Sequence, residues 1–170
     1  LIPTKHVDEL IHMFSQISPD DWKLVIVGGN AKKMNLLEEY RKLVNELEMN
    51  DKIQLVGEVS NVDQYLNQSK IFAFTSSSEG FPNALGEAMN AGLACVSYDC
   101  VAGPSDMITD GENGFLVPVG DKKMFRTRLE LLMSSEDIRL SLGKKAKQAM
   151  KEYEVERIAE KFYNFIRNNS

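Results

Sequence analysis

The sequence predicts an α/β fold: a Rossmann-like, doubly wound, mainly parallel sheet covered by helices, with a helical C-terminus. Short apolar runs alternate almost without interruption with longer segments whose apolar residues recur at helical spacing. Glycine, asparagine or proline stands at most of the junctions between them. Because parallel strands need crossover connections, and because the intervening helices supply them, an open sheet of this kind is the expected architecture.

Helices and strands are expected in a regular order along the chain. Apolar residues from Val7 to Ile17 predict a helix, and the run at 22–27 predicts a strand that ends at Gly28. Further strands are expected at 52–56, 71–75, 94–98 and 114–117. The helices between them are expected at 36–47, at 61–66 with Asn61 as the cap, and from Pro82 to Asn90. After Asp121 the chain is expected to be helical to Ser170.

The first helix has no strand before it, although sheets of this kind usually begin with one. In the 3-2-1-4-5-6 strand order, that strand would lie between the strands at 22–27 and 71–75. An open slot there would leave two rows of unpaired backbone groups, which buried structure rarely tolerates. We expect the slot to be closed by residues outside the 170, by strand exchange with another copy, or by rearrangement of the sheet.

Composition places the chain among ordinary globular domains and excludes several function classes. Its 170 residues suit one domain, and 43% of them are hydrophobic. The net charge of −5 argues against nucleic-acid binding, so a phosphate ligand would have to be held by local groups. No apolar run approaches the roughly 20 residues that span a bilayer.

Two cysteines, Cys95 and Cys100, lie on either side of an expected strand. An extended segment of that length spans roughly 16 Å, which exceeds the ~7 Å that a disulfide tolerates. We therefore expect two reduced, buried thiols and a cytoplasmic location.

Ligands of open parallel sheets bind beyond the carboxyl ends of the strands. One loop at this edge carries most of the chemistry: Gly80 allows close approach of a ligand to the backbone, just before the helix at Pro82. The N–H groups of Phe81, Asn83 and Ala84 are expected to be free at the helix N-terminus, where orphan donors and the helix dipole together bind phosphate.

Two acidic residues belong to the same segment. Glu87 lies in the second turn of the helix, where a carboxylate could accept both hydroxyls of a ribose. Glu79 lies just before the helix, on a loop tight enough to direct it toward a bound sugar. From spacing alone, the alternative that both are solvated surface acids stays equally open.

Residues 79–87, Glu-Gly-Phe-Pro-Asn-Ala-Leu-Gly-Glu, match the E-x7-E motif of the retaining family 4 glycosyltransferases (glycosyltransferase group 1). The match continues through 88–92, 94–97 and 110–117, and upstream it covers 23–28, 55–59 and 63–66. Because it runs in order through essentially the whole chain, the sequence resembles the C-terminal, donor-binding domain of a GT-B-fold enzyme of this family.

The resemblance implies a role for each matched position. Glu87 resembles the residue that binds the ribose hydroxyls of the donor, and Glu79 the acid that contacts the transferred sugar. Lys5 lies where family members carry a lysine that neutralises the diphosphate, although a solvated lysine is the alternative. The backbone that would hold sugar and diphosphate comprises Gly80, Phe81, Pro82, Asn83, Ala84 and Leu85. The segment that would recognise the base edge comprises Val56 and Gly57, with Glu58 beside them.

The activity that the resemblance implies is retaining hexosyl transfer from a UDP-type or other nucleotide sugar, without a metal or other cofactor. The acceptor, a glycan or lipid-linked sugar, would bind to an N-terminal domain that lies outside these residues. We therefore expect residues 1–170 to be an N-terminally truncated donor domain that is inactive alone. The loop at 98–105 resembles a subgroup that builds bacterial surface polysaccharides. Contact of the full enzyme with the inner face of the membrane stays open.

The last helix resembles the one that crosses back to the N-terminal domain in this family. Its apolar side chains are therefore expected to be partly exposed here; they include Ile158, Phe162, Phe165 and Ile166.

Two other functions are weighed against the transferase. A GT-B sugar-nucleotide 2-epimerase would need a histidine near the cleft, and neither His6 nor His12 is expected near Glu79. A non-enzymatic nucleotide-binding or flavodoxin-like signalling module is the second, but a phospho-receiver needs an acidic cluster after its first strand, which the segment around Lys5 lacks. His6 and His12 are six apart on one expected helix, face different sides and are not expected to bind a metal.

Overall fold

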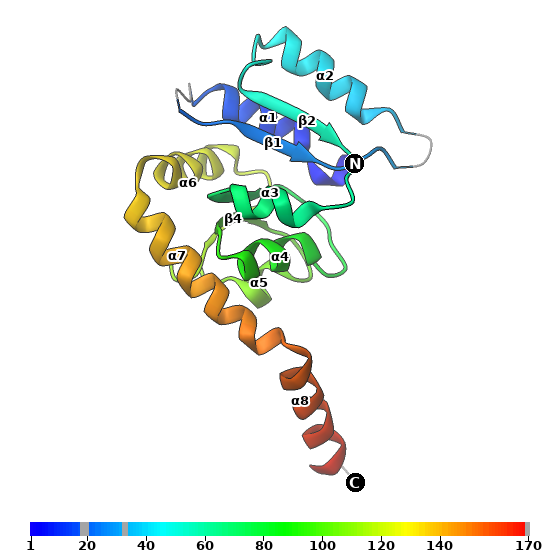
Figure 1. The fold of residues 1–170 in the computed structure, drawn as a ribbon, viewed down its shortest axis with the longest axis vertical. Coiled ribbons are helices and arrows are strands. Elements are labelled where there is room, and N and C mark those ends of the chain that lie inside the picture. Colours follow the sequence, from blue (N-terminus) through cyan, green and yellow to red (C-terminus); the bar gives the residue numbers. More distant parts are fainter. Residues whose placement is uncertain (18–20, 32–33, 169–170) are drawn as a thin grey trace.

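The computed structural model describes residues 1–17, 21–31 and 34–168, and it has the predicted α/β architecture (Figure 1). Its parallel strands form two groups. One group pairs β1 (Leu24–Val27) with β2 (Ile53–Gly57). The other contains β3 (Ile71–Phe74), β4 (Ala94–Asp99) and β5 (Phe115–Pro118). Each predicted strand is confirmed, with ends that shift by one or two residues.

Helices connect these strands as crossovers. Before β3 the chain forms a 3₁₀ turn (Pro3–Lys5), α1 (Val7–Ser15), α2 (Leu36–Glu46) and α3 (Val62–Gln68). The side chain of Asn61 caps α3, as predicted, by accepting a hydrogen bond from the N–H of Gln64. Between β3 and β5 lie α4 (Asn83–Ala91) and α5 (Pro104–Met107), of which α5 is too short to show a helical period in the sequence.

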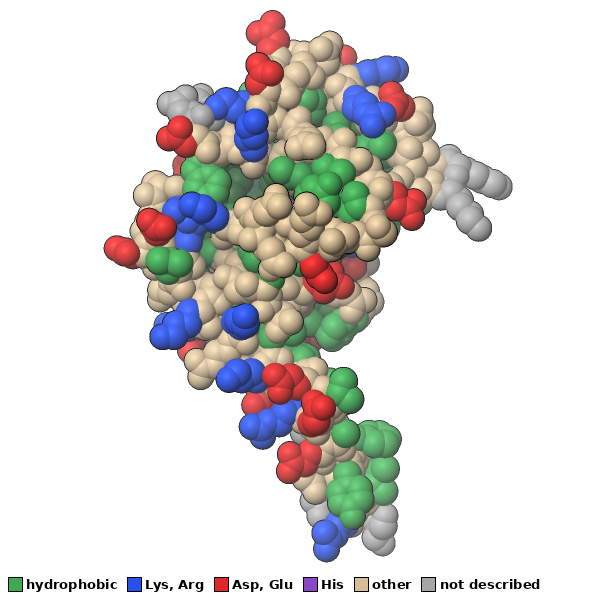
Figure 2. Space-filling view, viewed as in Figure 1, with side chains coloured by type: hydrophobic (Ala, Val, Ile, Leu, Met, Phe, Trp, Pro, Cys, Tyr) green, Lys and Arg blue, Asp and Glu red, His purple; other side chains and the backbone are tan. Residues whose placement is uncertain are grey.

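The chain after β5 is helical, as predicted, in the part that the structure describes. It forms α6 (Lys122–Ser134), α7 (Glu136–Ala149), a 3₁₀ turn (Met150–Tyr153) and α8 (Val155–Asn168). Ser170, where the predicted helix ends, lies outside the described residues. Figure 1 shows α8 projecting from the body, and Figure 2 shows apolar side chains along it. These are exposed, as expected: Val155, Ile158, Phe162, Phe165 and Ile166.

The strand order agrees with the predicted one on both sides of the expected slot. β2 and β1 form one group and β3, β4 and β5 the other, so β1 and β3 face the slot and neither pairs across it in the described part of the chain. Rearrangement of the sheet is therefore not how the slot is closed here. Closure by residues outside the 170 or by another copy stays a prediction.

α1 holds the two groups of strands together because it is apolar on two sides. Val7, Ile11 and Phe14 pack in a cluster with β1, β2 and α2. Leu10 and Met13 pack with β4, β5 and α6. Full burial of a side chain of this size contributes about 1.5–3 kcal/mol. The residues immediately before α1 therefore have a fixed position relative to both groups of strands.

Cys95 and Cys100 are both free and buried, as predicted. Burial raises the pKa of the Cys95 thiol to about 12, so this thiol stays protonated at neutral pH. In the described residues, no helix has both the length and the apolar character needed to cross a membrane.

Candidate functional site

The N-terminal residues bridge two loops at the carboxyl edge of the strands. The amino group of Leu1 contacts the carbonyl of Gly29, and the N–H of Ala31 donates to the carbonyl of Leu1 over 3.2 Å. On the other side, the N–H of Ser77 donates to the carbonyl of Thr4 over 2.9 Å. Residues 1–4 therefore join the loop after β1 to the loop after β3.

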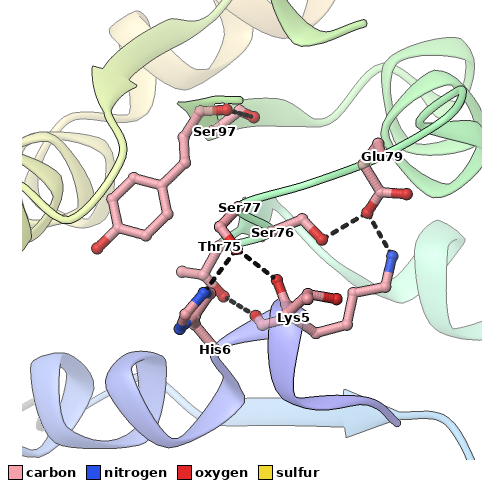
Figure 3. Close-up of polar contacts among 9 residues, drawn as sticks. Lys5, His6, Thr75, Ser76, Ser77, Glu79 and Ser97 are labelled. Atoms are coloured by element: carbon pink, nitrogen blue, oxygen red, sulfur yellow. Dashed lines mark hydrogen bonds and ion pairs between the residues drawn. The ribbon is translucent and has the colours of Figure 1, made fainter. Parts of the chain in front are cut away.

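Residues 4–6 and 75–79 form a cluster of polar contacts that we call the clasp (Figure 3). The Thr75 hydroxyl donates to the carbonyl of Lys5 over 2.7 Å, and Nε2 of His6 lies 2.8 Å from Oγ of Ser77. The ammonium of Lys5 forms an ion pair with Oε1 of Glu79. The clasp thus brings together two of the predicted site residues, Lys5 and Glu79.

Glu79 is held at one oxygen only. Its Oε1 accepts hydrogen bonds from both Lys5 and the Ser76 hydroxyl, while no partner of Oε2 is found in the described part of the chain. The side chain is 12% exposed, so its position is fixed by surrounding protein as well as by these bonds. Glu79 can therefore accept a ligand hydroxyl at Oε2 without giving up its anchor.

Lys5 reaches Glu79 because the turn before α1 is sharp. Pro3 opens the 3₁₀ turn, and His6 ends it in the left-handed region, with φ 46° and ψ 44°. That region costs a residue other than glycine roughly 1–2 kcal/mol. The Lys5 ammonium lies 5.5 Å from the centre of the Phe74 ring and is about one-third exposed, which leaves it accessible to an anion.

The start of α4 differs from the prediction in its first residue and in which N–H groups are free. The helix begins at Asn83 rather than Pro82, which is the N-cap residue with φ −81° and ψ 68°. The N–H groups of Phe81 and Ala84 have no partner among the described residues, as predicted. Those of Asn83 and Leu85 are not free: they donate to the carbonyls of Phe81 and Pro82 over 2.9 and 3.0 Å. Pro82 closes a tight turn, and this turn consumes donors that an ideal helix start would leave open.

Glu87 lies on the exposed face of α4, one turn beyond these free donors. Its neighbours Gly86 and Ala88 are buried against the core, whereas Asn83 and Ala84 share its exposed face. In the described residues Glu87 has no hydrogen bond or ion pair. Its carboxylate is therefore available to a ligand, as the ribose hypothesis requires.

The predicted base-binding segment ends β2. The N–H of Gly28 donates to the carbonyl of Gly57 over 2.8 Å, and both glycines have positive φ, at 147° and 86°. A Cβ on Gly29 would lie 3.0 Å from the Cβ of Glu58, so the loops after β1 and β2 are in close contact. The expected slot therefore separates this segment, Val56, Gly57 and Glu58, from the clasp and α4. Residues 1–4 connect the loops on the two sides of the slot.

Sequence reasoning missed four polar residues of the clasp and misplaced one of them; the four are His6, Thr75, Ser76 and Ser77. His6 was expected in the first helix, away from Glu79, but it precedes α1 and contacts Ser77. Ser76 and Ser77 were interpreted only as loop residues. Their roles depend on how the turn at 3–6 docks against the loop at 75–79, and no local pattern in either segment encodes that register.

A second polar group stands behind the clasp and centres on Glu9. This carboxylate accepts a hydrogen bond from the Tyr98 hydroxyl over 3.2 Å and lies 3.1 Å from the ammonium of Lys122. Its Oε1 is also 3.6 Å from Nδ1 of His6. Burial, reinforced by the charge of Glu9, raises the pKa of the Tyr98 phenol, so this hydroxyl stays protonated and acts as the donor.

A parallel sheet with converging loops and free helix N–H groups at its carboxyl edge defines a Rossmann-like ligand-binding domain. Residues 1–149 match the family of glycosyl transferases group 1, and the chain belongs to this family. The resemblance proposed from the sequence is thereby confirmed at the level of the family.

Relatives and solved structures agree with this assignment. The amylovoran biosynthesis glycosyltransferase AmsD of Erwinia amylovora is 29% identical over 162 residues, which cover 95% of this chain and 44% of AmsD. A Campylobacter jejuni enzyme, N-acetylgalactosamine-N,N'-diacetylbacillosaminyl-diphospho-undecaprenol 4-alpha-N-acetylgalactosaminyltransferase, is 31% identical over 150 residues, or 88% of this chain and 40% of the enzyme.

Among solved structures, Staphylococcus aureus TarM, crystallised with fondaparinux, alpha-GlcNAc-glycerol and UDP, superposes with a TM-score of 0.86 at 26% identity. The match covers 96% of this chain and 33% of TarM. The chain therefore has the fold of one part of a GT-B glycosyltransferase and spans less than half the length of the relatives it matches.

Proposed function

We propose that residues 1–170 form the donor-binding domain of a retaining hexosyltransferase that uses a UDP-sugar in the synthesis of a surface glycan. One observation carries the proposal: the clasp holds Lys5 and Glu79 together at the edge of the sheet where α4 presents free donors and Glu87. The UDP bound to TarM supports the choice of ligand, and the amylovoran biosynthesis glycosyltransferase AmsD and the capsular polysaccharide biosynthesis glycosyltransferase CapM of Staphylococcus aureus support the choice of pathway.

The diphosphate would lie between Lys5 and the start of α4. The ammonium of Lys5 and the free N–H groups of Phe81 and Ala84 supply positive charge and donors, and Gly80 keeps the approach open. Donors fixed before the reaction stabilise the charge that develops on a leaving diphosphate, because they need no reorganisation. We propose that these groups replace a metal ion in this role.

The remaining predicted residues would bind the other parts of the donor. Oε2 of Glu79 would accept a hydroxyl of the transferred sugar, and Glu87 would accept the two ribose hydroxyls. Val56, Gly57 and Glu58 would contact the edge of the base. The backbone around Pro82, Asn83 and Leu85 would shape the turn rather than donate, since two of its N–H groups are already used.

Transfer with retained configuration needs no protein nucleophile in this proposal. The bond between the anomeric carbon and the diphosphate oxygen breaks, and the acceptor oxygen bonds to that carbon from the same face. The acceptor proton passes to the departing diphosphate. A glycan or lipid-linked acceptor would be bound by another domain, as the undecaprenol-linked substrate named for the Campylobacter relative suggests.

One requirement of the epimerase alternative is met, because His6 lies beside the Glu79 loop, contrary to the sequence prediction. Its Nε2 is engaged with Ser77 and its Nδ1 faces Glu9, so the ring is held by protein on both sides. The matched family and the relatives are transferases. We therefore retain the transferase and assign His6 a different role below.

Calorimetric titration with UDP and with uridine tests the proposal. We expect the chain to bind UDP, and we expect Lys5→Ala to weaken UDP binding by about 1.5–3 kcal/mol while uridine binding changes little, because only UDP carries the diphosphate. Added salt should also weaken UDP binding. Lys145→Ala, on an exposed face of α7, is the matched control. Absence of UDP binding, as in a phospho-receiver, would refute the proposal.

A further inference from the structure

His6 combines a strained backbone with a precisely bonded side chain. It adopts the left-handed conformation, which glycine or asparagine adopts at lower cost. Strained positions persist where surrounding contacts over-determine them, and they gather at functional sites. The contacts of the His6 side chain therefore explain why a histidine, rather than glycine, occupies this strained position.

The imidazole of His6 bridges the clasp and the Glu9 group. The Ser77 hydroxyl has two contacts, of which the one with the carbonyl of Thr4 is long, at 3.4 Å. Nε2 of His6 lies 2.8 Å from the same oxygen, and the tautomer of the ring decides which of the two groups donates. On the opposite side of the ring, Nδ1 faces Oε1 of Glu9.

Glu9 gives the ring a rigid support. The Tyr98 phenol that bonds to Glu9 is fully buried in β4, and Lys122 contacts the same carboxylate from the start of α6. A continuous line of contacts therefore runs from the core through Glu9 and His6 to Ser77. Ser77 lies two residues before Glu79, and His6 lies one residue after Lys5.

We infer that His6 is a positioning residue: its ring ties Ser77 to Glu9 and thereby fixes Lys5 and Glu79 at the spacing that receives the diphosphate and sugar. This inference rests on the proposed function of the same site. It assigns His6 no contact with the ligand. Its effect passes through the loop at 75–79 and the turn at 3–6, whose side chains must otherwise be ordered when the ligand binds.

Three substitutions separate the ring contact from the backbone strain. His6→Gly relieves the strain and removes the contact. His6→Asn tolerates the left-handed conformation, but its amide reaches only as far as Nδ1. His6→Gln carries an amide as far out as Nε2, and this amide can donate to the Ser77 hydroxyl or accept from it. His12→Gln, on the exposed side of α1, is the control for the same chemical change.

Titration with UDP and uridine, together with thermal unfolding, tests the inference on the whole 170-residue chain. We expect His6→Gly and His6→Asn to weaken UDP binding about three- to tenfold, the scale of ordering a side chain on binding. Uridine binding should not change, and the melting temperature of His6→Gly should not fall. His6→Gln and His12→Gln should stay within about twofold of the unsubstituted chain for UDP.

Each other outcome is decisive. The inference is wrong if His6→Gly binds UDP as tightly as the original chain while Lys5→Ala does not, and the proposed function then stands. It is also wrong if His6→Gln loses as much affinity as His6→Gly, or if uridine and UDP lose affinity equally. Failure of the unsubstituted chain to bind UDP would instead remove the proposed function first.

Discussion

Glu87 is a carboxylate that the folded chain leaves unused, and this makes it informative. It is exposed on α4 with no ion pair or hydrogen bond among the described residues, so its substitution should not disturb the fold. If it binds the ribose hydroxyls, Glu87→Ala should weaken UDP binding by about 1.5–3 kcal/mol, as expected for hydrogen bonds to a charged group. Titration of both proteins with UDP measures the difference.

A matched control for this substitution is Glu46→Ala, another exposed helix glutamate, at the end of α2. It should leave UDP affinity unchanged. UDP lacking its ribose hydroxyls, as the dideoxy analogue, should bind both Glu87→Ala and the original chain with similar affinity. Equal dissociation constants for UDP itself would rule out the ribose assignment.

Individual site residues were predictable only where a local motif carried them. Glu79 and Glu87 lie on one loop and one helix, so their spacing along the chain fixes their geometry. The pairing of Lys5 with Glu79, and the contact of His6 with Ser77, join segments that are more than 70 residues apart. Such contacts depend on how α1 docks between the two groups of strands, and that docking has no signature in either segment.

At the scale of elements, the packing of α4 against α7 depends on two glycines that behave differently. A Cβ on Gly143 of α7 would overlap the carbonyl oxygen of Gly92, which ends α4. A Cβ on Gly86 of α4 would meet only the flexible tips of Met107 and Met150, at 3.5 Å or more. Helix propensity alone would favour alanine at both positions, by about 0.5–1 kcal/mol.

We therefore expect opposite signs for the two alanine substitutions. Gly86→Ala should leave the free energy of unfolding unchanged or raise it by up to about 1 kcal/mol. Gly143→Ala should lower it by about 1–3 kcal/mol, because a rigid backbone atom must move to admit the methyl group. Denaturant unfolding with a fixed m-value provides the comparison. A stabilising Gly143→Ala would show that the helices separate more easily than the close approach implies.

The helices and strands were well predicted, and the errors in that prediction share one cause. Strands such as β4 are continuous apolar runs bounded by glycine or polar residues, so sequence alone defines them. The late start of α4 and the presence of α5 are single-turn features that arise at prolines. Over so few residues, turn geometry and tertiary contacts decide the conformation, because a helical period cannot be recognised in a segment of one turn.

At the scale of the whole molecule, the site is built across a divided sheet. The base-binding segment belongs to the β1–β2 group, whereas the clasp and α4 belong to the β3–β5 group. α1 packs against both groups, and residues 1–4 bond to the loops after β1 and β3. The strand order predicted from the sequence pattern located the slot, and what closes the slot stays a prediction.

In the proposed function, the donor and the acceptor bind to different parts of the enzyme. Transfer requires that the donor and acceptor be held in one reactive geometry, and such positioning accounts for several kcal/mol of the barrier. The described residues supply groups for a donor, while the chain covers less than half of each relative named above. We therefore expect the 170-residue chain to bind UDP and yet transfer no sugar to glycan or lipid-linked acceptors.

Incubation with labelled UDP-sugars and a panel of such acceptors measures this directly, with UDP titration of the same preparation as proof that the donor site is intact. Thermal stabilisation by each UDP- or GDP-sugar would identify the preferred donor in parallel, because a ligand that binds only the folded state raises its stability. Turnover by the chain alone would mean that an acceptor site also lies within these residues. In that case the exposed edge between Glu79 and Glu87 would have to receive both substrates, and the assignment of a second domain would be wrong.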